Sequence, residues 1–384
     1  MKILFLIYHG LSNYSGISKK ILSQINGLKT NGHEIDLCHY EIMSNSHRCW
    51  MINDNIIHDF GVSKWGALQK KISYTCIIKH IKNGKYDFVY ARSYHNANPW
   101  TINLFRTLKR LGIKSVIEIP TFPYDQEYKT LPRQWQIELI MDKLFRNKLA
   151  KETNRIVTFT NHATIFGQKT ICISNAIDFD AIPIREPQTN KNGYVLLAVA
   201  EVHYWHGIDR IIEGLGEYYS QGGKEDIRLH IAGYIMDTEM NGSEFSPGFK
   251  NQIQKYHLKD KIILHGPVYG KELDELFNLA DFAIGSLGRH RCGIKNIKTL
   301  KNREYAARGI PFIYSENDED FEKMLYIVKA AADDSPISIK ELLKEIERMK
   351  KLSPATIRNS VRHLSWTCLL YTSPSPRDRT RSRM

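Results

Sequence analysis

The chain opens with a continuous apolar run, which predicts a buried strand. Residues 2–8, KILFLIY, are typical of a strand covered on both faces of a parallel sheet. Apolar residues then recur at helical spacing over 17–28, and Asn31-Gly32 ends this predicted helix. Residues 33–40, HEIDLCHY, alternate as a second strand. The first forty residues therefore predict a β-α-β unit.

The same rhythm continues to about residue 315 and is interrupted once. AIPIREPQTNKNG (181–193) has two prolines and no periodicity, which predicts a linker between an N-terminal domain, 1–180, and a C-terminal domain, 194–366. We expect an α/β protein with two facing Rossmann-like, doubly wound domains and a ligand cleft between them. Further strands are predicted at 86–92, 115–119, 155–160, 170–175, 194–200, 227–233, 261–266, 281–286 and 311–315, and helices at 101–112, 207–223 and 271–280.

The composition agrees with two globular domains, and the net charge indicates an anionic partner. The 384 residues are 42% hydrophobic and carry a formal net charge of +13. Nucleic acid, an acidic membrane and a phosphorylated small molecule would all satisfy this charge. The six cysteines are scattered without a C-x-x-C pair, which favours reduced thiols in a cytosol. No apolar run in the sequence is long enough to span a membrane.

The last residues depart from this pattern. From Cys368 the sequence reads CLLYTSPSPRDRTRSRM, where Pro, Ser and Arg replace the apolar periodicity. It resembles a translated adapter, so we expect residues 367–384 to be a non-native tail; the alternative is a natural disordered basic tail.

One stretch concentrates positive charge around a single carboxylate. Residues 286–313, SLGRHRCGIKNIKTLKNREYAARGIPFI, contain seven Lys or Arg and one acid, Glu304. A helix is predicted here, capped near Asn296 or Thr299 and closed by Gly309. Glu304 shares the apolar face of that helix, where a carboxylate needs a partner such as the paired hydroxyls of a sugar.

The cations of this stretch have two readings. The first amides of the helix and the basic residues beside them would form an anion site suited to a diphosphate. The alternative is an i, i+4 pair between Glu304 and Arg308, with the other cations on a solvated face. The basic residues in question are Arg289, His290, Arg291, Lys298 and Lys301.

Three motifs in the two-domain context resemble glycosyltransferase family four, of the GT-B fold, and most closely its members from bacterial surface-polysaccharide clusters. They are ISNAID (173–178), WHGIDRIIEGL (205–215) and LKNREYAARGIPFI (300–313). The resemblance implies a retaining, metal-independent transferase that uses a nucleotide-sugar as co-substrate and no cofactor. It covers nearly everything from Met1 to Trp366.

The resemblance also implies roles for single residues. Glu304 matches the second glutamate of the paired-glutamate motif, which holds the ribose. The amides around Thr299 and Leu300 match the diphosphate contacts. Gly16 matches the glycine-rich loop of the first domain, and Gly207 matches the glycine that follows the phosphate-binding lysine.

The sequence departs from the family at the donor site. Asn296 stands where the family's first glutamate contacts the donor sugar, and Glu201 and His206 stand where Arg and Lys contact the phosphates. Arg291, Lys301 or Arg210 would supply the missing charge. We expect His290, Arg291 and Lys301 to stabilise the leaving diphosphate.

Polar residues after the strands of the first domain are candidate acceptor contacts at the cleft rim. The alternative for each is a solvated loop or a core-packed side chain. The candidates are Arg92, His95, Glu118 and Tyr124.

Two further charged segments have ordinary explanations. Residues 318–320, Asp-Glu-Asp, resemble a metal-binding triplet, but we expect them to cap a helix N-terminus, and no metal site is predicted. Residues 64–85 hold six lysines and no acid, which fits docking on an anionic inner leaflet, with a solvated helix face as the default.

The sequence thus predicts a cytoplasmic glycosyltransferase that moves a sugar from a nucleotide-diphosphate donor to a saccharide acceptor, lipid-linked in surface polysaccharide synthesis. Peripheral docking on the inner face of the membrane is left open. The alternatives are a noncatalytic binder of anionic polymers, such as a degenerate transferase, and a GT-B nucleotide-sugar epimerase. A nucleic-acid partner is not expected, because the aromatic residues do not interleave with basic ones as a stacking platform requires.

Overall fold

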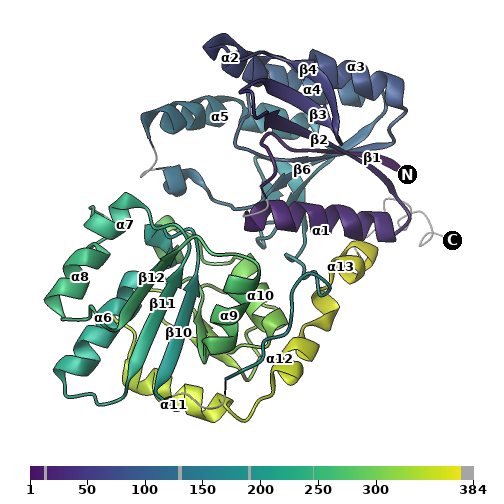
Figure 1. The fold of residues 1–384 in the computed structure, drawn as a ribbon. Coiled ribbons are helices and arrows are strands. Elements are labelled where there is room, and N and C mark those ends of the chain that lie inside the picture. Colours follow the sequence, from purple (N-terminus) through teal and green to yellow (C-terminus); the bar gives the residue numbers. More distant parts are fainter. Residues whose placement is uncertain (13–14, 129–131, 189–191, 245, 373–384) are drawn as a thin grey trace. The chain divides into compact units, whose positions relative to one another are not determined.

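The protein consists of two compact α/β units (Figure 1). The computed structural model describes residues 1–12, 15–128, 132–188, 192–244 and 246–372. Unit 1 comprises residues 1–174 and the segment from Trp366 onward, and unit 2 comprises residues 175–365. The described part of the predicted linker, 181–188, lies outside helices and strands and belongs to unit 2.

Unit 1 is built on a nine-stranded sheet in the order β4-β3-β2-β1-β5-β6-β7-β9-β8. The strands from β2 to β9 in this order pair in parallel, as predicted, whereas β3 and β4 form an antiparallel hairpin that the sequence pattern did not predict. The strands are β1 (Lys2–Leu6), β2 (Glu34–Ile42), β3 (Arg48–Ile52), β4 (Asn55–Asp59), β5 (Phe88–Arg92), β6 (Lys114–Ile119), β7 (Arg155–Thr158), β8 (Thr164–Ile165) and β9 (Gln168–Cys172).

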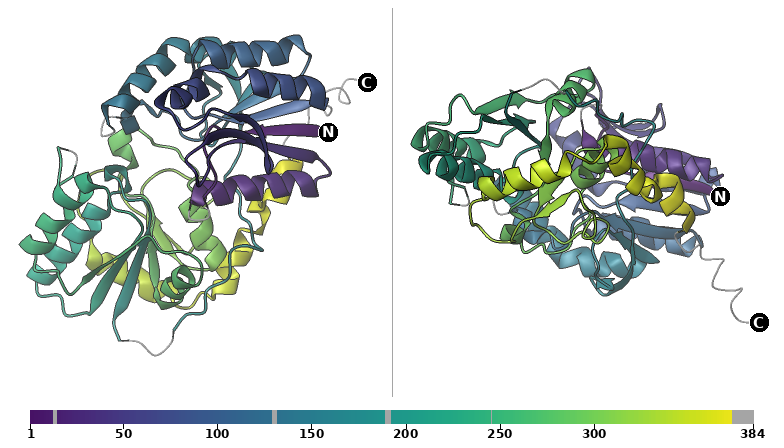
Figure 2. Two further views of the ribbon diagram at one scale, coloured as in Figure 1. Left: turned by 45° about the horizontal axis from the view of Figure 1, so that its top comes forward. Right: turned by 90° about the horizontal axis from the view of Figure 1, so that it is seen from below.

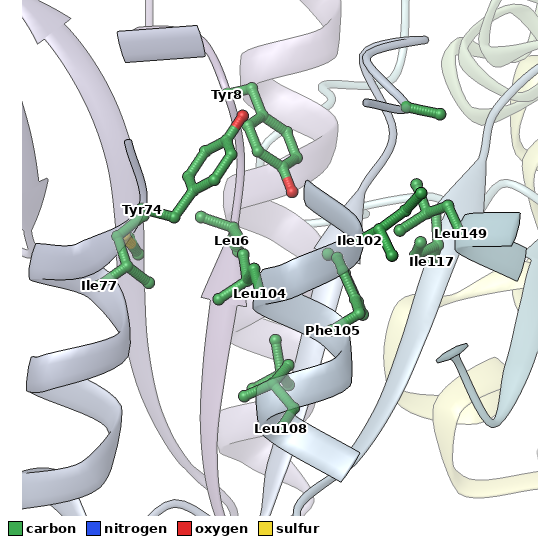
Figure 3. Close-up of a cluster of buried hydrophobic side chains, with 14 of the residues drawn as sticks. Leu6, Tyr8, Tyr74, Ile77, Ile102, Leu104, Phe105, Leu108, Ile117 and Leu149 are labelled. Atoms are coloured by element: carbon green, nitrogen blue, oxygen red, sulfur yellow. The ribbon is translucent and has the colours of Figure 1, made fainter. Parts of the chain in front are cut away.

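Helices cover this sheet and bury its apolar side chains. Figure 3 shows part of that core, where Leu149 of the long helix α5 lies beside Ile102 and Ile117. The C-terminal helix α13 packs on α1, and the lack of a side chain at Gly27 permits this contact, because a Cβ there would lie 2.8 Å from Trp366 Cβ. The helices are α1 (Gly16–Thr30), α2 (Lys64–Ile72), α3 (Thr75–Gly84), α4 (Pro99–Arg110), α5 (Arg133–Glu152) and α13 (Trp366–Thr372).

Unit 2 has a six-stranded parallel sheet in the order β12-β11-β10-β13-β14-β15. This is the doubly wound order, and its direction reverses between β10 and β13. The strands predicted over 194–315 are all present, and β15 was missed. The strands are β10 (Tyr194–Val199), β11 (Ile227–Ala232), β12 (Ile262–Gly266), β13 (Phe282–Ile284), β14 (Phe312–Tyr314) and β15 (Ile327–Lys329).

Helices pack on both faces of this sheet (Figures 1 and 2). One apolar cluster joins the sheet to α6, α8 and α11, and another joins it to α9, α10 and α12. Across the described residues, none of the helices has both the length and the apolar character needed to cross a bilayer. The helices are α6 (Ile208–Ser220), α7 (Asp237–Asn241), α8 (Phe249–Lys255), α9 (Lys271–Leu279), α10 (Leu300–Arg308), α11 (Ile339–Met349) and α12 (Pro354–Ser360).

Candidate functional site

The segments that follow β10 and β13 meet at the point where the strand order of unit 2 reverses. Gly207 follows the short 3-10 helix Tyr204–His206 and has φ +65°. A Cβ at Gly207 would lie 2.6 Å from the carbonyl carbon of Leu287, so only glycine allows this approach. The Leu287 amide also donates to the His206 carbonyl at 2.8 Å. Ligands of doubly wound folds bind at such reversal points, beyond the carboxyl ends of the strands.

Buried polar groups without partners gather at the ends of β13 and β14. The Ser315 amide donates to the Ser286 carbonyl at 2.9 Å, which holds the two strand ends together. Glu316 is only 2% exposed, yet neither of its carboxylate oxygens has a hydrogen-bond partner among the described residues. The same holds for the Ser286 hydroxyl, the Tyr314 hydroxyl and the Asn302 amide oxygen. Because buried polar atoms almost always have partners, this group has the capacity to hold a polar ligand.

We call Ser286, Lys301, Asn302, Tyr314 and Glu316 the β13–β14 cluster. Burial raises the pKa of Glu316 to about 7, although the Arg289 charge opposes this shift. Burial, reinforced by the charge of Arg289, lowers the pKa of Lys301 to about 7. The Lys301 amine has no ion pair or hydrogen bond within the described part of the chain. Ionised forms are therefore costly here until a ligand supplies partners.

His206 belongs to the same environment but serves as a neutral group. Burial, followed by the charges of Lys301 and Arg289, holds its pKa well below the usual value. Its Nδ1 accepts a hydrogen bond from the His203 amide at 3.0 Å. His206 therefore adds no positive charge where the family pattern has a lysine.

Helix α10 directs its first turn at the cluster. Thr299 is its N-cap and accepts from the Asn302 amide at 3.4 Å, so the second of the two predicted caps is confirmed. Gly309 closes the helix at φ +78°, as predicted. The amides at Thr299, Leu300 and Lys301 lie at the positive end of the helix dipole, which favours an anion.

Glu304 forms the i, i+4 pair with Arg308 that was the alternative interpretation of the sequence. Its Oε1 accepts from Arg308 Nε at 3.0 Å, and Arg308 Nη1 also pairs with Asp274 at 2.7 Å. The Glu304 side chain is partly exposed beside this pair. The ribose contact of Glu304 stays a prediction.

Three residues predicted to contact or stabilise the diphosphate have structural partners. Arg291 makes a bidentate pair with Asp209, at 2.8 and 3.0 Å, and contacts Asp334 at 2.7 Å; these carboxylates raise its pKa against the effect of burial. His290 Nε2 lies 3.1 Å from the same Asp334. Arg210 is buried and donates to main-chain carbonyls, including that of Ser335 at 2.7 Å. Of the three predicted catalytic residues, Lys301 alone lies in the β13–β14 cluster with its amine unpaired among the described residues.

Asn296 lies next to the loop that carries Glu316. The Asn317 amide group donates to Asn296 Oδ1 at 3.2 Å, and the Ile297 amide donates to the Asn317 carbonyl at 3.1 Å. Sequence reasoning missed Glu316. The available signal was a carboxylate placed directly after the buried strand PFIYS.

The expectation for residues 318–320 was wrong. These residues lie in a turn and do not open a helix. Asp318 and Asp320 instead bind the buried guanidinium of Arg303, and Arg303 Nε donates to the Asn175 carbonyl at 3.2 Å. This network ties the ISNAID motif to α10.

The candidate acceptor residues belong to unit 1, where Arg92, Glu118 and Tyr124 are buried and His95 is half-buried, as in the core-packed alternative. Glu118 pairs with Arg92 and, at 2.6 Å, with Lys20. His95 stacks on the Tyr124 ring at 3.7 Å, and burial together with the Arg92 charge lowers its pKa to about 3. The Tyr124 hydroxyl donates to Asp142 at 2.5 Å. Their acceptor role stays a prediction.

Gly16 and Glu201 have open surroundings. Gly16 is the first residue of α1, and a Cβ there would meet nothing within 4 Å. Two residues of the loop before it, 13–14, lie outside the described residues. Glu201 is exposed and pairs with His203 at 3.5 Å.

A protein-family model matches part of the chain. Residues 182–354 match the family model of glycosyl transferases group 1. No curated protein sequence matches the chain. The match spans the β13–β14 cluster and most of unit 2.

Solved structures match both units at low sequence identity. The apo form of the lipopolysaccharide outer core galactosyltransferase WaaB has a TM-score of 0.60 and 13% identity, with 97% of each chain covered. The catalytic domain of starch synthase IV from Arabidopsis thaliana, bound to ADP and acarbose, has a TM-score of 0.61 and 11% identity, covering 96% of this chain and 97% of that one. Anabaena Alr3699/HepE in complex with UDP-glucose has a TM-score of 0.51 and 13% identity, covering 97% and 95%. The predicted GT-B fold with two Rossmann-like domains is confirmed.

Proposed function

We propose that the protein is a glycosyltransferase that moves a sugar from a nucleotide-diphosphate donor to a saccharide acceptor. The observation that carries this proposal is the β13–β14 cluster, where the buried Glu316 carboxyl and the half-buried Lys301 amine lack partners among the described residues, beside the N-terminus of α10. The GT-B fold and the family match over residues 182–354 support it.

The cluster suits the two halves of such a donor. Glu316, Ser286 and Asn302 would hydrogen-bond hydroxyl groups of the sugar nucleotide, and Lys301 with the first amides of α10 would face the diphosphate. In the reaction, the bond between the anomeric carbon and the diphosphate oxygen breaks, and the acceptor hydroxyl oxygen forms the new bond while its proton passes to the departing diphosphate. Negative charge grows on the diphosphate, and a preorganised lysine stabilises it most strongly in the transition state.

The finer features rest on the family resemblance. We propose a retaining, metal-independent transfer of a hexosyl group to a lipid-linked saccharide in surface polysaccharide synthesis, on the cytoplasmic side of the membrane. Glu304 would hold the ribose after exchanging its pair with Arg308.

Calorimetric titration of the full chain with UDP-, GDP- and ADP-sugars tests this proposal. We expect one donor class to bind, and Glu316→Gln and Lys301→Met each to weaken it at least tenfold. Glu322→Gln is the matched control, because Glu322 is an exposed acid near the same loop. Binding of no sugar nucleotide, or wild-type affinity in both cluster variants, would contradict the assignment.

The substitutions at the donor site favour a second candidate, a noncatalytic binder that keeps the fold. Asn296 and neutral His206 stand where the family has a carboxylate and a cation. Incubation of the donor with candidate acceptors distinguishes the possible functions. Transfer to an acceptor supports the enzyme, conversion of donor alone indicates an epimerase, and binding without turnover indicates the noncatalytic protein.

A further inference from the structure

The net charge of the protein resides almost entirely in unit 1. Residues 1–174 contain 24 Lys and Arg against 12 Asp and Glu, whereas residues 175–365 contain 26 against 28. The charge of +13 is therefore not a property of the donor-site unit. Unit 1 has a reason of its own to meet an anionic partner.

Helix α5 of unit 1 is apolar on two opposite faces. Its inner face buries Leu139 and Leu149 in the core, where Figure 3 shows Leu149. Its outer face exposes four large apolar side chains at helical spacing i, i+3, i+4 and i+7. These are Ile137, Ile140, Met141 and Leu144, which are 60%, 60%, 42% and 66% exposed.

Basic residues flank this outer face at both ends. Arg133 precedes it and Lys148 follows it on the same side of α5, and both are exposed. The carboxylates of α5 are neutralised within the unit. Asp142 is buried against Tyr124, Glu138 pairs with Lys71 of α2, and Glu152 pairs with Arg106.

The neighbouring helix α2 adds to the surface. The Lys71–Glu138 ion pair joins α2 to α5, and both helices appear in the upper part of Figure 1. Trp65 and Leu68 of α2 are exposed, and Lys64 beside them is exposed as well. Tryptophan with lysine is typical of surfaces that settle between headgroups and acyl chains.

We propose that the outer face of α5, together with α2, docks on an anionic lipid bilayer. The four apolar side chains of α5 enter the acyl boundary, while Arg133 and Lys148 contact acidic headgroups. A second copy of the chain fits less well, because it would bring an equally positive unit against this one. Nucleic acid would use the cations but would press the Ile and Leu side chains against phosphates.

Sedimentation of the full chain with vesicles tests the proposal without any sugar nucleotide. It rests on the proposed function only in that a membrane would present a lipid-linked acceptor. Donor titration tests the proposed function and vesicle binding tests the docking surface, so either experiment can fail without the other. We expect binding to phosphatidylcholine vesicles that contain 30% phosphatidylglycerol, little binding to phosphatidylcholine alone, and release at high salt.

The decisive variant is the double substitution Ile140→Glu with Leu144→Glu, which should weaken vesicle binding at least tenfold. Both positions face solvent, and an unchanged melting temperature and circular dichroism spectrum would show that the fold survives. The matched control is Leu325→Glu, because Leu325 is 70% exposed but belongs to unit 2. It should bind vesicles as the wild type does.

Three results would overturn the proposal. One is equal vesicle binding by the double variant and the wild type. The second is a dimer that the double variant dissociates while vesicle binding stays absent. The third is preferential, salt-sensitive binding to duplex DNA in competition with the anionic vesicles, unaffected by the double variant.

Discussion

Both units place charged side chains at the carboxyl ends of their central strands, but they treat the charges differently. In unit 1, Glu118 at the end of β6 pairs with Lys20 and Arg92 and also accepts from the Tyr90 hydroxyl at 2.7 Å. In unit 2, Glu316 after β14 and Lys301 of α10 lie in one electrostatic environment without an ion pair among the described residues.

The pKa values of the two carboxyl groups report this contrast. Burial acts to raise both. The charges of Lys20 and Arg92 overcome it and lower the pKa of Glu118 to about 2. No comparable pair opposes burial at Glu316, and its pKa rises to about 7. A complete network serves folding, whereas an incomplete one has room for a ligand.

Breaking the complete network should have the largest effect. Glu118→Gln leaves Lys20 and Arg92 buried without their carboxylate, which should cost about 3–5 kcal/mol of the free energy of unfolding. Urea denaturation at pH 7 measures this loss. Glu34→Gln is the control, because Glu34 is exposed on the same unit and its pair with Lys2 should contribute about 1 kcal/mol or less. Equal losses in the two variants would refute the contrast.

The two carboxyl groups should make stability depend on pH with opposite signs. The contribution of Glu118 is present above its unfolded pKa and is lost as pH falls from about 4.5 towards 2. The contribution of Glu316 is full below about 4.5 and is lost as pH rises through 7, by at most about 3 kcal/mol. Glu316→Gln should therefore gain stability over the wild type between pH 5 and 8, as urea denaturation at each pH would show. Parallel pH profiles for the two proteins would contradict this.

Donor binding should follow the protonation of Lys301. Its amine, with a pKa of about 7, loses its charge as pH rises, so affinity for a diphosphate donor should fall about tenfold between pH 6 and 8.5. Lys301→Arg keeps its charge over this range and should show a smaller fall in calorimetric titrations. An identical pH dependence in both proteins would show that donor binding does not depend on the protonation of Lys301.

The smallest change in stability is expected at Gly16, at the start of α1. Gly16→Ala places a Cβ in open space at the first helical position, so the free energy of unfolding should change by no more than about 0.5 kcal/mol. Gly27→Ala is the contrasting variant, because its Cβ would press on Trp366. If Gly16 faces the donor, Gly16→Ala should lower transfer activity with stability intact. Unchanged turnover would remove Gly16 from the site.

The sequence was most informative where apolar residues form continuous runs. Parallel strands buried on both faces, such as β1 and β10, were predicted from those runs, and their order along the chain implied the doubly wound arrangement. Helix α5 was not predicted, because apolar residues on its outer face as well as its inner face obscure the helical periodicity. The hairpin β3–β4 escaped because its short strands lie outside the alternating pattern of strands and helices.

Side-chain partners were much harder to predict. The sequence identified Lys301, but it assigned free charge to Arg291 and Arg210, which bind Asp209 and main-chain carbonyls. Asp209 lies 82 residues from Arg291 and the Ser335 carbonyl lies 125 residues from Arg210, and no local pattern encodes contacts at such separations. Glu316 was missed because only the fold reveals that its carboxylate is buried and has no hydrogen-bond partner among the described residues.

The packing of α13 on α1 sets an order of assembly during synthesis. Every residue of unit 2 leaves the ribosome before Trp366, so unit 2 can complete its sheet while the chain is still growing. Unit 1 begins first, but Trp366, which lies against Gly27, is synthesised only after all of unit 2. In nascent chains that stop short of Trp366, we therefore expect residues 175–365 to resist proteases while α1 is still cleaved near Gly27.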